Sequence, residues 1–423
     1  MAKFMGIGVA ALVCAQAFHG FAAAPAKTDP GPQPTVRLAV EPLGYAPPST
    51  FYLIYRLSSG SLNFIDSDHL LFTFHLNTLM RRLPGDTDGD EDQTIRAVVL
   101  QISTGKVVTQ VDWRMHDRGQ YLWPMGGGRF LIRQRDTLYT TDRTLALKPY
   151  LRLTDPIEAL KFSPDGKLLL VEVKQPLSER RPGPTAADPV PEIGTRPTRI
   201  YLVRAATQKV IATSVTHEPI DMPIVDNGYM EALSARQNNQ WLIQYVPVEG
   251  TPKQLTNVPS TCQPTQTPLS VDVTLVSGCV GTTGDHVVSA VSMEGKLLWQ
   301  QTWSSHYIWP TFAMAENGSR FAYGSLLTTH DIGTLDPVNE SDIASQMVGV
   351  FDTATGQLKM VKKANPILSA GQNFALSPDG NRFAILNEGS IEVYDLPPAA
   401  AAVNPSSVVS PSSVAQKSVA QKK

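Results

Sequence analysis

The residues best suited to bind a metal ion lie in one acidic stretch, GDTDGDEDQ, at residues 85–93. Alternating carboxylates suit a hard cation such as calcium, which takes six to eight oxygen ligands. An EF-hand loop that began at Asp86 would need glycine at its sixth position and glutamate at its twelfth, where Glu91 and Ala97 stand. A solvated acidic loop is therefore the favoured interpretation. The alternative is a calcium site formed by Asp86, Asp88, Asp90 and Asp92.

Two cysteines could form a disulfide. The N-terminal segment has Lys3, an apolar run, and small-residue cleavage sites at Ala15-Gln16-Ala17 and around residues 22–24, which is the pattern of a signal peptide. Residues 1–24 are predicted to be this peptide, with cleavage near residue 17 or residues 22–24. Export would remove Cys14 and place Cys262 and Cys279 in an oxidising compartment, where an even pair favours a disulfide. Two buried free thiols are the alternative.

Catalytic signatures are scarce. The sequence has no GxSxG elbow, no Walker phosphate loop and no HExxH or Cys/His zinc spacing, and Gly126-Gly127-Gly128 indicates a tight turn. His306 lies in the aromatic stretch WQQTWSSHYIW at residues 299–309. These aromatic side chains could stack a sugar or another flat ligand, but packing between neighbouring sheets is the favoured interpretation. These observations favour a protein that is not an enzyme and has no cofactor.

The elements that must position any site are short strands joined by tight turns. Residues 374–396, FALSPDGNRFAILNEGSIEVYDL, contain three apolar runs separated by turns, and residues 160–173, LKFSPDGKLLLVEV, repeat the pattern. Asp-Gly between β-rich runs is a strong hairpin signal because glycine accepts a positive φ. Seven such sites join a first to a second strand: Ser67-Asp68, Gly127-Gly128, Asp165-Gly166, Asn227-Gly228, a degenerate site near Ser270-Val271, Asn317-Gly318 and Asp379-Gly380. A second series joins third to fourth strands at Thr104-Gly105, Asp142-Arg143, Thr207-Gln208, Glu249-Gly250, Glu294-Gly295 and Thr355-Gly356.

The sequence therefore predicts an all-β, seven-bladed β-propeller of four-stranded antiparallel blades over residues 35–398. The seventh repeat has no fourth strand, because the chain becomes rich in Ala, Pro and Ser after residue 397, and residues 399–423 are predicted to be disordered. An N-terminal strand would complete the last blade and close the ring, which removes exposed sheet edges. Residues 51–57 are the preferred closing strand because only a short connector then leads to the first repeat, and residues 35–43 are the alternative.

These repeats resemble the exported bacterial propellers of the WD-repeat-like and quinoprotein-like kind. The resemblance rests on the Ser-Pro-Asp-Gly turns at residues 163–166 and 377–380 and on the Thr-Gly turns that precede apolar strands. The Gly-His and Trp-Asp pairs of true WD repeats are missing, and the chain is too short for the eight-bladed quinone-binding dehydrogenases. The resemblance implies the fold and not an activity.

Three repeats carry insertions between their second and third strands, at residues 77–94, 174–197 and 326–346. In an antiparallel blade this connection lies opposite the Asp-Gly and Thr-Gly turns, so all three insertions are predicted to decorate one face. Loops gathered on one side of a rigid scaffold are common binding sites. The second insertion contains six prolines with Arg180 and Arg181 and could dock on a partner as an extended segment. Neutral drift in loop length is the alternative.

Composition narrows the function. Charged residues make up 17% of the chain and the net charge is -2, so no electrostatic footprint for nucleic acid is present. Outside the leader, no segment reaches the roughly 20 apolar residues of a transmembrane anchor. The favoured prediction is a periplasmic or secreted, monomeric, non-catalytic propeller that binds an unknown protein or small-molecule ligand. The alternative is a propeller enzyme, such as a lactonase, lyase or quinoprotein-like oxidoreductase, with its site at the mouth of the central channel.

Overall fold

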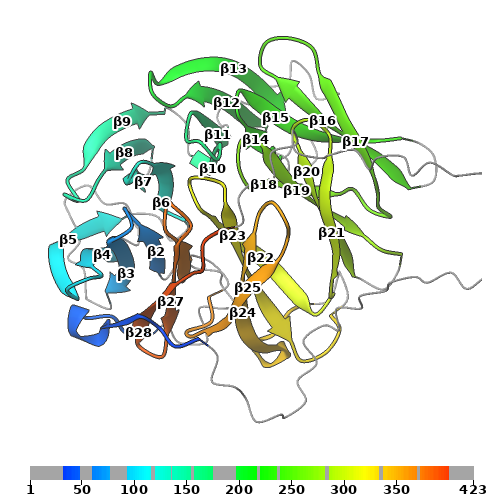
Figure 1. Cartoon of the computed structure of the whole chain (residues 1–423). Coiled ribbons are helices and arrows are strands. Elements are labelled where there is room, and N and C mark those ends of the chain that lie inside the picture. The colour runs from blue at the N-terminus through cyan, green and yellow to red at the C-terminus, as the bar shows by residue number, and fades with distance from the viewer. Residues whose placement is uncertain are drawn as a thin grey trace, which may run out of the picture.

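The protein forms a ring of seven sheets in its computed structural model (Figure 1). The structure describes residues 32–47, 60–76, 93–115, 120–134, 136–153, 157–174, 197–216, 220–235, 239–281, 285–332, 337–368 and 372–399. Each sheet has four antiparallel strands, so the predicted fold class is confirmed. Within the described ranges the helices are the 3-10 turns η1 (Glu41–Leu43) and η3 (Glu340–Asp342), neither of which could cross a bilayer.

Successive sheets, called blades 1 to 7, follow the chain. Blade 1 contains β2 (Gly60–Phe64), β3 (His69–Leu76), β4 (Gln93–Gln101) and β5 (Lys106–Met115). Blade 2 contains β6 (Leu122–Gly126), β7 (Arg129–Gln134), β8 (Thr137–Thr141) and β9 (Lys148–Arg152). Blade 3 contains β10 (Ile157–Phe162), β11 (Leu168–Lys174), β12 (Thr198–Arg204) and β13 (Lys209–Thr216). Blade 4 contains β14 (Ile224–Val225), β15 (Gly228–Ser234), β16 (Gln240–Pro247) and β17 (Lys253–Pro259).

The second half of the ring has the same plan. Blade 5 contains β18 (Thr265–Pro268), β19 (Val273–Cys279), β20 (His286–Ser292) and β21 (Leu297–Trp303). Blade 6 contains β22 (Tyr307–Met314), β23 (Arg320–Thr328), β24 (Ile343–Asp352) and β25 (Leu358–Ala364). Blade 7 contains β26 (Phe374–Leu376), β27 (Arg382–Asn387), β28 (Ser390–Asp395) and β1 (Val36–Ala39).

Both predicted turn series are confirmed. The seven first-series sites join the first and second strands of the blades, and the six second-series sites join the third and fourth strands. Because neighbouring strands are antiparallel, both series lie at one end of the blades, which we call the turn face. The connections between second and third strands, where the three insertions fall, lie at the other end, which we call the insertion face. The first strand of each blade is the innermost and the fourth is at the rim (Figure 1).

The hydrophobic core lies between the blades. Side chains alternate across each strand, so every blade offers apolar residues to both neighbours. On β11, for example, Leu169 and Val171 pack against blade 2, whereas Leu168 and Leu170 pack against blade 4. Seven such clusters join the successive blades of the described ring, and the cluster between blades 7 and 1 includes Leu38 of β1.

The ring is closed by an N-terminal strand, but the preference for residues 51–57 was wrong. The fourth position of blade 7 is held by β1, which pairs with β28 from Val36↔Val393 to Ala39↔Ser390. This is the alternative that the sequence left open at residues 35–43. The preference gave too much weight to a short connector, since the entropic cost of a loop rises slowly with its length. Residues 51–57 lie outside the described residues.

Other predictions also fall outside the described residues: the signal peptide, the tail from residue 400 onward and most of the first two insertions. They stay predictions. Of the third insertion, only residues 333–336 are outside that range.

Candidate functional site

The turn face carries rigid turns built by local side-chain hydrogen bonds. In blade 7, the Ser377 hydroxyl donates to the Asp379 carboxylate at 2.5 Å and accepts from the Arg382 N–H at 2.9 Å, while Asp379 also accepts from the Asn381 N–H at 3.1 Å. Ser163 and Asp165 repeat this arrangement in blade 3. Ser-Pro-Asp-Gly thus specifies a turn in which serine and aspartate replace backbone partners.

Glycine is required in these turns because successive blades approach closely there. Gly166 has φ +68°, and a Cβ at this position would lie 2.1 Å from the Met125 carbonyl oxygen of blade 2. Asn317 of blade 6 similarly donates to the Pro378 and Asp379 carbonyl oxygens of blade 7 at 3.0 and 2.8 Å. The inner turns therefore form a packed backbone ring around the channel mouth.

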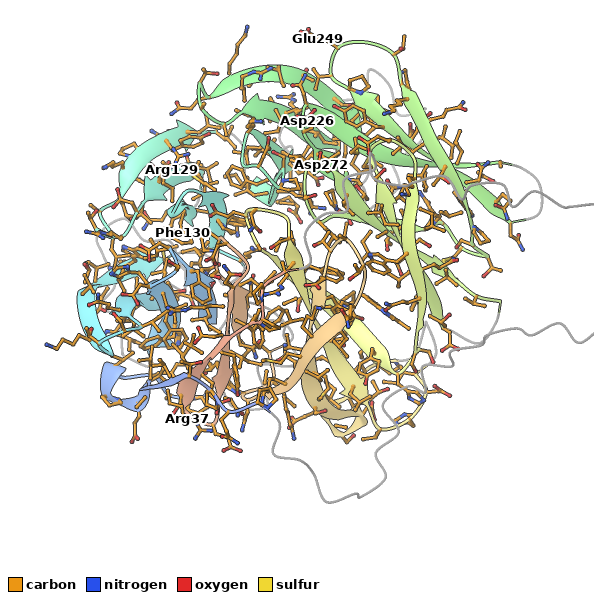
Figure 2. All side chains as sticks on the ribbon, viewed as in Figure 1. Arg37, Arg129, Phe130, Asp226, Glu249 and Asp272 are labelled. Atoms are coloured by element: carbon orange, nitrogen blue, oxygen red, sulfur yellow. A yellow bond between two sulfur atoms is a disulfide. The ribbon has the colours of Figure 1, made fainter. Side chains whose placement is uncertain are left out.

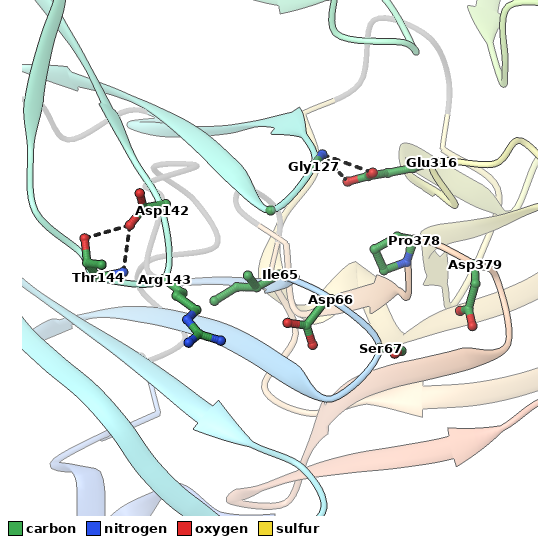
Figure 3. Close-up of a pocket in the computed structure, with 11 residues that line it drawn as sticks. Ile65, Asp66, Ser67, Gly127, Asp142, Arg143, Thr144, Glu316, Pro378 and Asp379 are labelled. Carbon is green, nitrogen blue, oxygen red and sulfur yellow. Dashed lines mark hydrogen bonds between the residues drawn. The ribbon is translucent and has the colours of Figure 1, made fainter.

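A cavity of about 640 Å³ opens among these inner turns (Figure 3). Its wall comes from the first-series turns of blades 1, 2, 6 and 7, and it extends outward to the second-series turn of blade 2. The Glu316 carboxylate of blade 6 reaches the Gly127 N–H of blade 2, with both oxygens 3.1 Å from the nitrogen. The polar lining residues are Asp66, Ser67, Asp142, Arg143, Thr144, Glu316 and Asp379.

The carboxylates of this mouth are already hydrogen-bonded by nearby groups. Asp66 accepts from the Asp68 and His69 N–H groups at 2.8 and 2.9 Å. Hydrogen bonds from the Thr144 hydroxyl and N–H lower the pKa of Asp142. Burial would raise the pKa of Asp379, but the hydrogen bonds from Ser377 and Asn381 outweigh it and the pKa is lowered.

This arrangement keeps two of the mouth carboxylates charged. Asp142 and Asp379 stay ionised at neutral pH, whereas a carboxylic acid that donates protons needs a raised pKa. Among the described residues, no group of three or more His, Cys, Asp or Glu side chains is arranged to hold a metal ion. What the mouth presents is a fixed set of acceptors beside the guanidinium of Arg143.

The sequence did not single out the mouth residues, although a signal was present. In three blades, the residue directly before the predicted first-series turn lines the cavity. These residues are Asp66, Glu316 and Pro378. This position identifies only candidate cavity residues, because the other four blades have the same position. Which of them meet depends on the geometry of the ring.

The acidic residues proposed for calcium, Asp86, Asp88, Asp90 and Asp92, lie outside the described residues. The structure contains the Cys262–Cys279 disulfide, with 5.5 Å between the Cα atoms. Cys279 ends β19, and Cys262 precedes β18. The disulfide joins the two chain segments at the insertion-face end of the β18–β19 hairpin. The degenerate turn near Ser270 lies at the other end of this hairpin, on the turn face.

The first part of the aromatic stretch around His306 packs between blades 5 and 6, as favoured. Trp299 is buried and stacks on Phe321, with 6.3 Å between ring centroids, and its indole N–H donates to the Thr353 carbonyl at 2.8 Å. The Trp303 ring lies 4.3 Å from that of Tyr323. His306 is partly exposed and lies 3.4 Å from the Asp331 carboxylate on the insertion face.

Comparison with solved structures gives propellers. Acylaminoacyl peptidase from Pyrococcus horikoshii matches with a TM-score of 0.47 and 11% identity over 81% of this chain and 52% of the peptidase. A putative TolB from Agrobacterium tumefaciens matches with a TM-score of 0.38 and 14% identity over 72% of this chain and 98% of that protein. An oligogalacturonate lyase in complex with manganese matches with a TM-score of 0.42 and 11% identity over 81% of this chain and 99% of the lyase.

This chain spans about half the length of the peptidase that it matches. No protein-family model and no curated protein match the sequence. The chain is a seven-bladed β-propeller, and at these identities the likenesses describe the fold alone.

Proposed function

We propose that this protein is an exported, non-catalytic β-propeller that binds a partner or ligand at the turn-face mouth. The observation that carries the proposal is the state of the mouth carboxylates. Asp66, Asp142 and Asp379 are held by hydrogen bonds within their own turns, and Glu316 is held by the Gly127 N–H across the mouth. Such groups are preorganised acceptors, which lowers the ordering cost of binding.

Export is supported by the signal-peptide pattern at residues 1–24. Cell fractionation tests it directly: the protein should be found outside the cytoplasm, with a mature N-terminus near residue 17 or residues 22–24. Cytoplasmic protein that retains Met1 would contradict export without affecting the binding proposal.

The binding test uses a matched pair of variants in capture from the native cell envelope. The mouth variant, Asp66→Asn with Glu316→Gln, removes two carboxylates without changing side-chain size. The control, Glu249→Gln with Asp272→Asn, removes the same charge from exposed turn residues of blades 4 and 5 (Figure 2). A partner retained by the wild type and the control but lost by the mouth variant supports the proposal.

Two results would overturn it. If the mouth variant keeps the partner while a variant with short turns in place of residues 77–94, 174–197 and 326–346 loses it, binding belongs to the insertion face. The second result concerns activity. If the purified wild type hydrolyses lactones, cleaves uronate oligosaccharides or oxidises alcohols with a quinone acceptor, and the mouth variant does not, the mouth is an active site.

A further inference from the structure

We propose that a second cavity, between blades 2 and 3 on the turn face, binds a small molecule through its carboxylate or phosphate group. The cavity measures about 430 Å³, which lies within the roughly 300–1,000 Å³ of small-molecule sites. It is lined by Met125 and Arg129, and the channel mouth is lined by Gly127 and Gly128, so the first-series turn of blade 2 separates the two. The inference is independent of the function proposed for the mouth.

The charge of this cavity is opposite to that of the mouth. Three cationic residues line it: Arg129 at the start of β7, Lys167 in the turn before β11, and Arg204 at the end of β12. The carboxylate lining it is Asp165, which pairs with the Lys167 ammonium at 2.8 Å and accepts from the Ser163 hydroxyl at 2.7 Å. One cation is thus neutralised inside the site, and two guanidinium groups remain.

Neither guanidinium is paired with the cavity's carboxylate. Arg204 Nη2 lies 3.5 Å from the side-chain oxygen of Asn227, a neutral and distant partner. Arg129 belongs to blade 2 (Figure 2) and lines the cavity. It is close enough to Tyr150 for its charge to act on the phenol: burial raises the pKa of Tyr150, and the charge of Arg129 opposes the rise. Planar guanidinium groups match the paired oxygens of a carboxylate or phosphate better than an ammonium does.

The walls are rigid and mixed in polarity. The Tyr150 hydroxyl donates to the Ala205 carbonyl at 2.7 Å, which ties the rim strand of blade 2 to the second-series turn of blade 3. The close approach of Gly166 to the Met125 carbonyl fixes the inner end. The Tyr150 ring with the side chains of Met125 and Ala205 supplies apolar surface. A ligand with one anionic end and a short uncharged body fits this lining.

The experiment is calorimetric titration of the full chain with inorganic phosphate and, separately, with butyrate, at an ionic strength held constant with chloride. Wild type should bind one of them saturably, and the tighter probe tells phosphate from carboxylate recognition. Arg129→Gln should weaken that binding at least tenfold. Arg129→Lys keeps the charge without the planar guanidinium, so its affinity should lie between those of wild type and Arg129→Gln. Arg152→Gln is the control, because Arg152 is 80% exposed on β9 of the same blade and carries the same charge.

Equal thermal midpoints of the variants would establish that each is folded. The proposal is overturned if Arg152→Gln weakens binding as much as Arg129→Gln, because the effect would then reflect the general field of the surface. It is also overturned if wild type shows no saturable binding of either probe up to about 10 mM, beyond the weak end of specific affinities. The mouth variant, Asp66→Asn with Glu316→Gln, should bind the anion as wild type does, so failure here and failure of the proposed function are separable.

Discussion

Replacing Arg320 with alanine should destabilise the ring more than any exposed charge substitution. The Arg320 side chain is fully buried in blade 6, and its Nε donates to Asp352 Oδ1 at 3.0 Å. Its Nη1 donates to the Gly380 carbonyl of blade 7 at 2.6 Å, and its Nη2 donates to the Pro397 carbonyl beyond the last strand. One side chain therefore joins two blades and the segment that leaves the fold.

The magnitude follows from what the truncation leaves behind. Breaking a buried ion pair by removing one partner costs about 3–5 kcal/mol, because the remaining charge loses its compensation. Asp352 would retain Lys359, whose Nζ lies 2.7 Å from the other carboxylate oxygen, which favours the lower end of that range. We expect Arg320→Ala to lower the free energy of unfolding by about 3 kcal/mol, measured by equilibrium denaturation in urea.

Arg152→Ala is the control, since Arg152 is 80% exposed and lies 3.2 Å from Asp136. Exposed pairs of this kind contribute about 0–1 kcal/mol. Arg320→Lys should lose less than Arg320→Ala, because an ammonium can keep the pair with Asp352 but not all three hydrogen bonds. If Arg320→Ala is no less stable than Arg152→Ala, the assignment of stability to this buried network is refuted.

Three further outcomes are expected. Because hydrogen bonds lower the pKa of Asp379 in the fold, its stabilisation is present at neutral pH and is lost as the pH falls. Asp379 is exposed, so solvent screening reduces the effect, and Asp379→Asn should be only about 0.5 kcal/mol less stable than wild type at pH 7. This difference should shrink below about pH 4, as measured by urea unfolding at both pH values. Replacing Cys262 and Cys279 with serine should lower the free energy of unfolding by about 3 kcal/mol through loss of loop-closure entropy, and a thiol assay that finds both cysteines free in protein isolated from its native compartment would remove the basis for this expectation. Gly166→Ala should destabilise more than Gly281→Ala, since both have positive φ but only Gly166 faces a carbonyl within contact distance, and equal thermal midpoints would contradict the close-approach argument.

The blade plan was readable from the sequence because it depends on local chemistry. Glycine at a positive φ, and serine or aspartate that replaces a backbone partner, are visible as short motifs wherever the turn occurs. Even the degenerate turn of blade 5 follows this logic, since the Ser270 hydroxyl accepts from the Asp272 and Val273 N–H groups at 3.1 Å each. The number of blades, their order and the need for a closing strand all follow from those motifs.

The identity of the closing strand was a different problem, because two N-terminal segments had suitable composition. The choice is made by long-range contacts that no local pattern reveals. Leu38 packs into the cluster between blades 7 and 1, while Arg37 reaches the buried Glu392 carboxylate of β28 at 2.6 Å. Alternation along β1 thus places an apolar side chain and a charged side chain on opposite sides, each with a partner some 350 residues away.

The channel mouth has the same dependence on long-range geometry. Glu316 and Gly127 are 189 positions apart, and they meet because blades 6 and 2 face each other across the ring. The turn motifs predict that both residues lie on the turn face near the channel axis. They do not predict that the Glu316 carboxylate reaches the Gly127 N–H. That contact also limits how a ligand at the proposed mouth site could engage Glu316: the ligand could add a donor to the remaining lone pairs or displace the Gly127 N–H. A ligand of the first kind would leave the turn of blade 2 held by Glu316, whereas a ligand of the second kind would release that turn from Glu316.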